Sequence, residues 1–339
     1  WAVESRVYAE DPFRNFLPSI GRLVKYRPPA EGTKDGITVR NDTGVEEGGE
    51  ISMYYDPMIA KLVTHGATRI AAIDAQADAL DAFYIDGIQH NVPFVSALMH
   101  HPRWREGRLS TGFIAEEYPE GFFPRVAEGE ARSVLVAVAA AIDHLHNARR
   151  RQISDQMAHE VQFAKRRIVE IGGAREQIEV AGTDGKLLYV STIAPDGSVA
   201  STVAVSSSWQ AGEPVWRGQV GGKDVSVQVR PILNGATLSY RGVQSPVYVY
   251  TEREAELAAL MPVKAAADMS KFLLCPMPGL VKAIHVGEGD EVKAGDALAV
   301  VEAMKMENIL RAERDGSVKK VNAKAGDSLA VDAVILEFA

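Results

Sequence analysis

Gly279-Leu280-Val281-Lys282-Ala283-Ile284 and Gly316-Ser317-Val318-Lys319-Lys320-Val321 are two copies of one β-rich pattern, 37 positions apart. The same spacing relates Gly289-Asp290 to Gly326-Asp327. A repeat this short predicts one supersecondary unit duplicated, because neither half buries its apolar face alone. Two such halves packed face to face make a flattened β-sandwich with two-fold pseudo-symmetry. Lys305 falls at the turn that joins them, where a side chain is displayed to other molecules.

Residues 271–339 resemble a biotinyl domain. The resemblance is carried by Glu302-Ala303-Met304-Lys305-Met306 and by the upstream Pro276-Met277-Pro278-Gly279. It implies that Lys305 carries biotin through an amide on its Nζ, with Met304 and Met306 beside it in the attachment motif. The amide removes the charge of a group whose free pKa is about 10.4, so the arm enters an apolar pocket without desolvating an ammonium. A lipoyl domain shares the fold but usually has Asp-Lys-Ala at this turn, so Met-Lys-Met favours biotin.

Composition and charge narrow the class of protein. At 339 residues the chain is long enough for two or three domains. Its net charge of −8 gives no support to nucleic acid or an anionic membrane as a partner, and the longest apolar run, Val134 to Ile142, is too short to span a bilayer. The single cysteine, Cys275, fits a reducing compartment. We therefore expect the cytoplasm, or the mitochondrial matrix if the source is eukaryotic. Because the chain begins at Trp1, we also expect it to be the C-terminal part of a longer polypeptide.

Residues 1–118 are predicted to form one unit. Val3 to Ala9 alternates polar and apolar positions and predicts a strand. Thr68 is a good N-cap for a helix, and a second helix is expected over Val92 to His100. Three stretches resemble the C-terminal subdomain of biotin carboxylase, an ATP-grasp enzyme: Ala2 to Pro12, Phe16 to Ser19 and Tyr54 to Leu62.

This second resemblance assigns roles to two residues. Arg6 is implied to be the catalytic cation that stabilises the ureido anion of biotin, since a guanidinium is permanently charged and has a fixed fork of donors. Phe16 is implied to pack on the biotin ring. The structural alternative for Arg6 is an ion pair with Glu4 or Glu10. The structural alternative for Phe16 is an aromatic side chain in the core. ATP, Mg²⁺ and bicarbonate are implied as co-substrates, but we find no glycine-rich flap and no carboxylate pair for a metal in these residues.

Residues 130–255 are predicted to combine a helix with a small β-barrel. An alanine-rich helical pattern runs from Glu130 to about Ile171, and beyond Gly172-Gly173 the period changes to two. About six to eight antiparallel strands are expected, the clearest of them over Val225, Val227 and Val229. This part resembles the domain that joins the subunits of acyl-CoA carboxylases. Residues 256–270 are expected to be a linker, of which ten flexible residues would span roughly 17 Å. The fold class is therefore multidomain α+β.

The acceptor of the carboxyl group is expected on another chain. About 150 residues separate the two recognised regions, fewer than the roughly 250 of the TIM barrel that performs this step in pyruvate carboxylase. The resemblance is thus to α subunits of biotin-dependent acyl-CoA carboxylases, ligases that form a carbon–carbon bond. It implies a carboxyltransferase β subunit, a biotin protein ligase and a large α/β hetero-oligomer as partners. Local likeness at Ile51 to Met58 and Leu273 to Gly279 favours propionyl-CoA, carboxylated to methylmalonyl-CoA, over 3-methylcrotonyl-CoA.

Two other classes stay open from the residues. One is a biotin carrier on an inert scaffold, in which Arg6 would face solvent or a structural ion pair. The other is the carrier of a biotin-dependent decarboxylase, which needs no ATP-grasp subdomain. Residues 1–118 argue against both.

Overall fold

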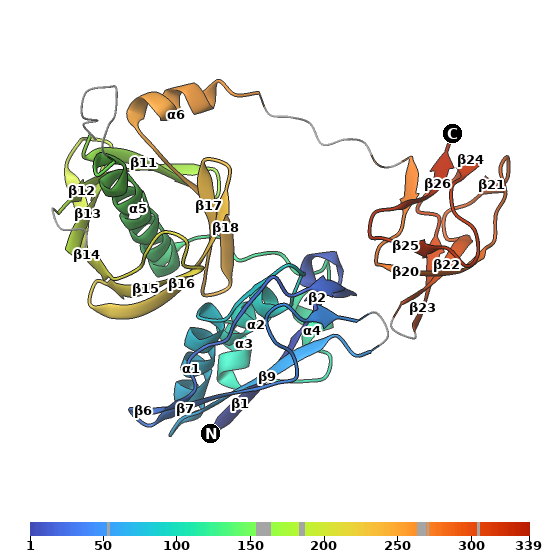
Figure 1. Cartoon of the computed structure of the whole chain (residues 1–339), viewed down its shortest axis with the longest axis horizontal. Helices are drawn as coiled ribbons and strands as arrows, with labels where there is room; N and C mark the ends of the chain where they lie inside the picture. The colour runs from blue at the N-terminus through green and yellow to red at the C-terminus, as the bar shows by residue number, and fades with distance from the viewer. Residues whose placement is uncertain (53–54, 154–163, 183–186, 263–268, 270, 304–305) are drawn as a thin grey trace.

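The computed structural model describes residues 1–52, 55–153, 164–182, 187–262, 269, 271–303 and 306–339. Figure 1 shows three parts: an N-terminal unit, a barrel around a helix that lies beside it, and a C-terminal sandwich. Among the described helices, none has the length and apolar character that crossing a lipid bilayer requires.

The N-terminal unit is built on a four-stranded antiparallel sheet. Its order is β1 (Ala2–Tyr8), β9 (Met58–His65), β7 (Ile37–Thr43), β6 (Gly32–Lys34). Around this sheet lie three short strand pairs and one turn of 3-10 helix: β2 (Glu10–Asp11) with β3 (Leu17–Pro18), β4 (Gly21–Arg22) with β8 (Glu50–Ile51), β5 (Lys25–Arg27) with β10 (Tyr84–Asp86), and η1 (Pro12–Arg14). The predicted strand at Val3 to Ala9 is confirmed as β1.

Four helices complete this unit: α1 (Arg69–Asp81), α2 (Val92–Met99), α3 (Pro102–Glu106) and α4 (Phe113–Glu117). Thr68 caps α1 as predicted, because its side chain accepts a hydrogen bond from the amide of Ala71. Buried Gln76 fixes α1 on the sheet by donating to the carbonyl of Leu62 on β9, at 3.1 Å. The two predicted helices are therefore confirmed.

The middle of the chain is a closed antiparallel barrel around a helix. The strands follow one another in sequence order: β11 (Arg166–Ile171), β12 (Ala174–Ala181), β13 (Leu187–Ile193), β14 (Val199–Ser207), β15 (Val215–Val220), β16 (Lys223–Ile232), β17 (Gly235–Tyr240) and β18 (Val243–Tyr250). In Figure 1 the strands surround α5 (Gly129–Arg151). Every residue from Val134 to Ala141 is buried, so the helix is apolar on all sides over this stretch, which packs in the core of the barrel. The prediction of a barrel with a helix in or beside it is confirmed, with the helix inside.

The expected helix from Glu130 to about Ile171 is too long. In the structure α5 ends at Arg151, and Arg166–Ile171 is strand β11. The reason is Arg167, which points inward on the strand and is 5% exposed, so that a charged residue occupies a core-facing position. Its guanidinium Nε lies 3.1 Å from Asp143 Oδ2 on α5. A charged residue at a core-facing position interrupts the alternation of polar and apolar residues that identifies a strand. Only the tertiary structure reveals the partner that allows it there.

The expected linker over 256–270 begins too early. Helix α6 (Glu252–Ala259) occupies its first residues and opens with a capping box, in which Thr251 and Glu254 satisfy each other's backbone amides. Ala255 is buried, and its carbonyl accepts a hydrogen bond from Arg175 of the barrel at 3.0 Å. The charged run is therefore a helix packed on the barrel, and the link to the sandwich starts after it.

The C-terminal sandwich consists of two four-stranded sheets, with orders β19-β26-β24-β21 and β23-β22-β20-β25. The strands are β19 (Phe272–Leu274), β20 (Gly279–Ile284), β21 (Glu291–Val292), β22 (Ala297–Ala303), β23 (Met306–Arg311), β24 (Gly316–Val321), β25 (Ser328–Leu329) and β26 (Val334–Phe338). Strands related by the 37-residue shift, such as β20 and β24, lie in different sheets. Each copy of the repeat thus completes the sheet of the other.

The two Gly-Asp turns hold the copies together. Gly289 donates to the carbonyl of Val318, and Gly326 donates to the carbonyl of Val281, both at 2.8 Å. The two glycines have φ values of +90° and +92°, a region that favours glycine. The predicted sandwich with two-fold pseudo-symmetry is confirmed.

Candidate functional sites

The attachment motif lies where β22 and β23 meet. Ala303 pairs with Met306 across these strands. The two residues between them, Met304 and Lys305, lie outside the described residues, as does the side chain of Met306. The roles predicted for these three residues therefore stay predictions.

The strands that lead to Lys305 are packed tightly on the upstream motif. A Cβ at Gly279 would lie 2.6 Å from the carbonyl oxygen of Glu302 and 2.7 Å from Val301 Cγ1, so only glycine fits there. Met277 is buried, and its Sδ accepts a hydrogen bond from Asn308 Nδ2 at 3.4 Å. The sequence showed these residues only as part of a motif. Their packing holds strands β22 and β23 firmly against the start of β20.

Arg6 lies on the outer side of β1, since its neighbours Ser5 and Val7 are buried. Its side chain is 60% exposed, and its Nε lies 3.8 Å from Glu4 Oε1. Exposed pairs at this separation contribute little to stability. The structure therefore places Arg6 in solvent with a loose partner, which is the arrangement that the inert-carrier interpretation predicted.

The backbone on either side of Arg6 is held firmly. Asn91, at the start of α2, donates from Nδ2 to the carbonyl of Arg6 at 3.1 Å and accepts from the amide of Tyr8 at 2.9 Å. Asn91 is itself buried. The strand thus presents the guanidinium from a fixed position, as a preorganised cation requires.

Phe16 is half-buried and packs edge-on against Phe94, with 4.8 Å between ring centroids. Its backbone is left-handed, with φ +58°, and so is that of Asn15. A bulky residue in this region is uncommon and costs free energy, which the aromatic packing offsets. The structure shows the core role that was the alternative for Phe16; its predicted contact with biotin stays a prediction.

A carboxylate pair lies close to this region. Burial and the nearby Asp56 both raise the pKa of Glu10, the first residue of β2. Asp56 Oδ1 in turn accepts a hydrogen bond from the amide of Met58 at 3.0 Å. The sequence offered Glu10 only as part of a family motif and as an ion-pair partner for Arg6, since a shifted pKa depends on neighbours that the sequence does not reveal.

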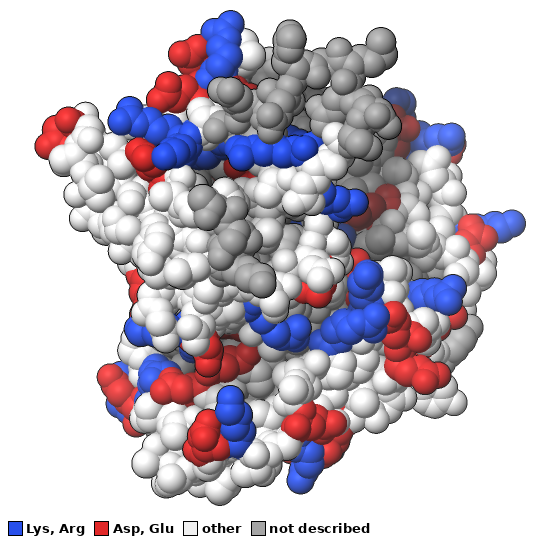
Figure 2. All heavy atoms as spheres, turned by 60° about the vertical axis from the view of Figure 1, so that its left-hand side comes forward, with Lys and Arg blue, Asp and Glu red and all other residues white. Residues whose placement is uncertain are grey.

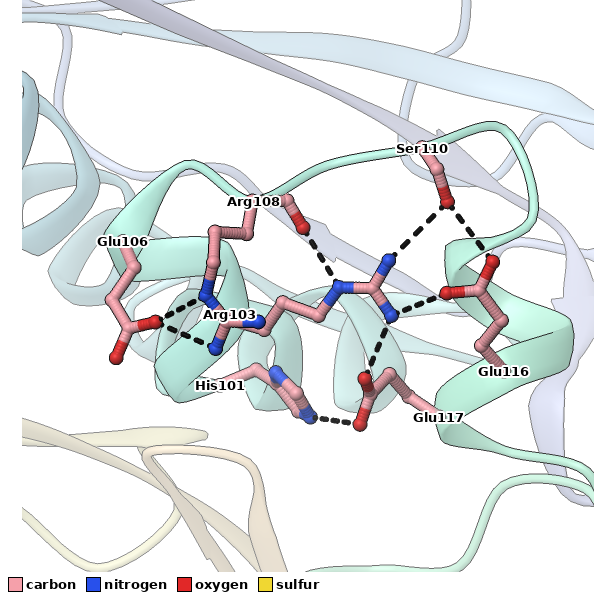
Figure 3. A network of polar contacts seen from close by, with 7 residues as sticks. All are labelled: His101, Arg103, Glu106, Arg108, Ser110, Glu116 and Glu117. Atoms are coloured by element: carbon pink, nitrogen blue, oxygen red, sulfur yellow. Dashed lines mark hydrogen bonds and ion pairs between the residues drawn. The ribbon is translucent and has the colours of Figure 1, made fainter.

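The N-terminal unit contains a polar network that the sequence did not predict. Arg103 Nη1 lies 2.8 Å from Glu117 Oε1 and 2.5 Å from Glu116 Oε2, and His101 Nε2 lies 3.3 Å from Glu117 Oε2 (Figure 3). Hydrogen bonds from Arg103 hold the pKa of Glu117 below its usual range. The network joins α3 to α4, and its charged groups pair with one another. We therefore infer that it stabilises the fold and has no role in binding or catalysis.

Within the described residues, no group of His, Cys, Asp and Glu side chains has the arrangement of a metal site.

Three family models match the chain in succession. "Biotin carboxylase C-terminal domain" matches residues 4–116, "Propionyl-coenzyme A carboxylase BT domain" matches residues 135–264, and "Biotin-requiring enzyme" matches residues 272–338.

The chain belongs to the biotin-dependent carboxylase family.

Relatives within this family agree with the three domain matches. A propionyl-CoA carboxylase alpha chain from Ruegeria pomeroyi is 49% identical, with 100% of this chain and 51% of that chain aligned. The mitochondrial propionyl-CoA carboxylase alpha chain from Mus musculus is 36% identical, over 100% of this chain and 46% of that chain. The methylcrotonoyl-CoA carboxylase subunit alpha from Mus musculus is 30% identical, over 99% and 47%. The chain spans about half the length of the curated relatives it matches.

Proposed function

We propose that this chain is the C-terminal half of the α subunit of a propionyl-CoA carboxylase. In the whole protein, ATP and bicarbonate would carboxylate biotin on Lys305, which would deliver the carboxyl group to a β subunit that makes methylmalonyl-CoA from propionyl-CoA. The observation that carries this proposal is the order of the three parts in one chain. A carboxylase subdomain, a helix-filled barrel and a biotinyl sandwich follow one another, and each part matches the corresponding family model.

Lys305 would hold the biotin. When bound, biotin supplies a ureido nitrogen that takes up a carboxyl group at one site and releases it at another. The chain would present this lysine between strands β22 and β23, against which Gly279 and the buried Met277 pack. Met304 and Met306 flank the attachment point in the motif.

Arg6 would hold the negative charge that develops on oxygen during carboxylation of biotin, with Mg²⁺ and ATP bound by the part of the protein outside this chain. Two observations support this role: Asn91 fixes the strand that carries Arg6, and the guanidinium has only a loose partner in Glu4. Its charge is therefore free to meet a substrate oxygen. Phe16 would pack on the biotin ring from its place beside Phe94.

The barrel would dock the β subunit, and a biotin protein ligase would modify Lys305. The family model over residues 135–264 is named for propionyl-CoA carboxylase, whose relatives are named as alpha chains. Figure 2 shows Lys and Arg intermixed with Asp and Glu over the face that the barrel contributes to, which suits a mostly polar interface between subunits. We further propose a large α/β hetero-oligomer in the cytoplasm or, in a eukaryote, in the mitochondrial matrix.

A second candidate function is a biotin carrier without carboxylase activity. The exposure of Arg6 and its ion pair with Glu4 favour it. A 3-methylcrotonyl-CoA carboxylase α subunit is a third, supported by the relative at 30% identity, whereas the relatives at 49% and 36% favour propionyl-CoA.

One experiment separates these functions. The full-length protein is co-purified with its β subunit, and ATP-dependent fixation of labelled bicarbonate is measured with propionyl-CoA and with 3-methylcrotonyl-CoA as acceptors. Our proposal predicts fixation that needs ATP and prefers propionyl-CoA. Preference for 3-methylcrotonyl-CoA would reassign the substrate, and biotinylated protein without ATP-dependent fixation would identify an inert carrier.

A further inference from the structure

The barrel and the N-terminal unit meet through buried hydrogen bonds. Gln228 of β16 donates from Nε2 to the carbonyls of Leu80, at 3.1 Å, and Phe83, at 2.9 Å. Arg230, two residues on, donates to the carbonyl of Ile85 at 2.9 Å. Leu80 lies in the last turn of α1, and its carbonyl also accepts a hydrogen bond from the amide of Phe83 at 3.1 Å. A barrel side chain therefore adds a second bond at the end of a helix in the other unit.

The two backbones also touch directly. Gly242, in the turn between β17 and β18, has φ +75°, and a Cβ there would lie 2.7 Å from the Cα of Ala97 on α2. Arg241, next to it, donates its amide to Asp81 Oδ1 at 2.9 Å. Only glycine permits this approach, so the contact is close packing between the two units.

A small space remains inside this contact, and several residues that line it have polar atoms without a hydrogen bond. Its volume is about 20 Å³, and residues of α1, α2 and the barrel surround it. Among the described residues, ten buried side-chain atoms lack a hydrogen bond, and five of them belong to residues that line this space. They are Asp81 Oδ2, His90 Nδ1, Ser96 Oγ, Arg230 Nε and Gln244 Oε1.

Burial of these atoms without hydrogen bonds lowers the stability of the folded chain. Asp81, His90 and Ser96 are each more than nine-tenths buried. Asp81 Oδ2 lies 3.4 Å from Arg241 Nε, and the Ser96 hydroxyl favours the charged form of Asp81, yet neither Asp81 Oδ2 nor Ser96 Oγ makes a hydrogen bond of good geometry. A buried polar atom without a partner destabilises the fold, and five around one space call for a shared partner.

We propose that this space is a binding site for ordered water, which bridges the N-terminal unit to the barrel. A water molecule needs at least about 10–15 Å³ and two to four polar partners, so the space holds one molecule or at most two. Donors and acceptors are both present, since Arg230 Nε donates and Gln244 Oε1 accepts. A metal ion is a poor fit because, of the residues lining the space, only Asp81 carries a carboxylate.

The site has a mechanical consequence. A seam of bridged, buried polar groups opposes sliding of the barrel on the N-terminal unit, because each displacement would break several hydrogen bonds. The N-terminal unit and the barrel would then move as one body.

The test is a crystal structure of the whole protein together with three variants. Ser96→Val fills the space with methyl groups, Ser96→Ala removes only the hydroxyl, and Ser133→Val is the matched control at an exposed position of α5. We expect a density peak within hydrogen-bond distance of at least three of the five atoms, persisting in Ser96→Ala. We also expect Ser96→Val to melt about 3 °C or more below the control.

An empty space in the wild-type density would overturn the proposal. So would a Tm of Ser96→Val at or above that of the wild type, because a dry cavity gains packing when methyl groups fill it. If Ser96→Val does not fold, the peak in Ser96→Ala decides: its loss with an intact fold would refute a water held by several partners.

Discussion

Arg14 of the N-terminal unit and Asp332 of the C-terminal sandwich form an ion pair, with Arg14 Nη2 2.9 Å from Asp332 Oδ1 and 318 positions between them. Asp332 stands where the other copy of the repeat has Gly295, and both residues are left-handed, with φ +60° and +94°. Aspartate tolerates this conformation less well than glycine does. The second copy of the repeat therefore has Asp332 in place of glycine at the position that contacts Arg14 of the N-terminal unit.

This pair leads to a prediction about docking of the biotinyl sandwich. In the full-length protein, Asp332→Lys should slow carboxylation of the attached biotin roughly two- to fivefold, since an exposed pair contributes about 0–1 kcal/mol. Carboxylation of free biotin should not change. The double variant Arg14→Asp with Asp332→Arg should recover the rate, and Glu313→Lys, a charge reversal elsewhere on the sandwich, serves as control. Equal losses with attached and free biotin would assign the pair to the fold.

Biotin should be attached at Lys305. Protein co-expressed with a biotin ligase should gain one biotin by intact-mass analysis, mapped by peptide sequencing to Lys305, and Lys305→Arg should gain none. Thermal stability should be unchanged, because the motif leads us to expect a displayed lysine, and such a side chain contributes little to folding. Lys282→Arg is the control, since Lys282 is paired with Glu302 on the same domain at 2.6 Å. A lipoyl mass, or an adduct at another lysine, would refute the assignment.

Arg6 should matter for rate and not for binding of ATP. In the full-length protein, Arg6→Ala should lower carboxylation of free biotin by about 10²- to 10³-fold, as does the removal of one donor to a developing oxyanion. Arg40→Ala is the matched control, because Arg40 lies on the same sheet, is 63% exposed and pairs with Asp42 at 3.0 Å. Carboxylation within twofold of wild type in both variants would show that Arg6 has no catalytic role.

The barrel should hold the β subunit. Replacement of residues 130–255 by a flexible linker of matched span should abolish co-elution with the β subunit in size exclusion, while ATP-dependent carboxylation of free biotin survives. If the complex still assembles, the barrel is a spacer that sets the reach of the sandwich, and another surface joins the subunits.

Asp81 should make the stability of the chain depend on pH. Burial raises the pKa of Asp81 from 3.8 to about 8, although Arg241 opposes the rise. Because the pKa is higher in the folded chain, the folded chain holds this proton more tightly, and the stabilisation is lost as the pH rises through about 8. The Tm should therefore fall between pH 6 and pH 9, and the fall should be smaller in Asp81→Asn. Asp74→Asn, on the same helix, is the control; parallel curves for wild type and Asp81→Asn would contradict the prediction.

The sequence determined those features that depend on near neighbours. Thr68 caps α1 through the amide of Ala71, three residues away. The 37-residue repeat predicted the sandwich because two copies of one pattern have to bury the same faces. The alanine-rich pattern over Val134 to Ala141 predicted a helix, and in the structure all of these apolar side chains are buried.

Only the tertiary structure decided features that depend on a distant partner. Arg167 sits in the core of the barrel because Asp143 neutralises it, and no local pattern contains both residues. The capping of α1 by Gln228 joins residues 148 apart, and the unpaired atoms of Asp81, His90 and Ser96 gather only once the barrel lies against α1 and α2. Hydrogen bonding and desolvation act over a few ångströms, so which groups they affect is settled by the packing of the chain and not by the order of its residues.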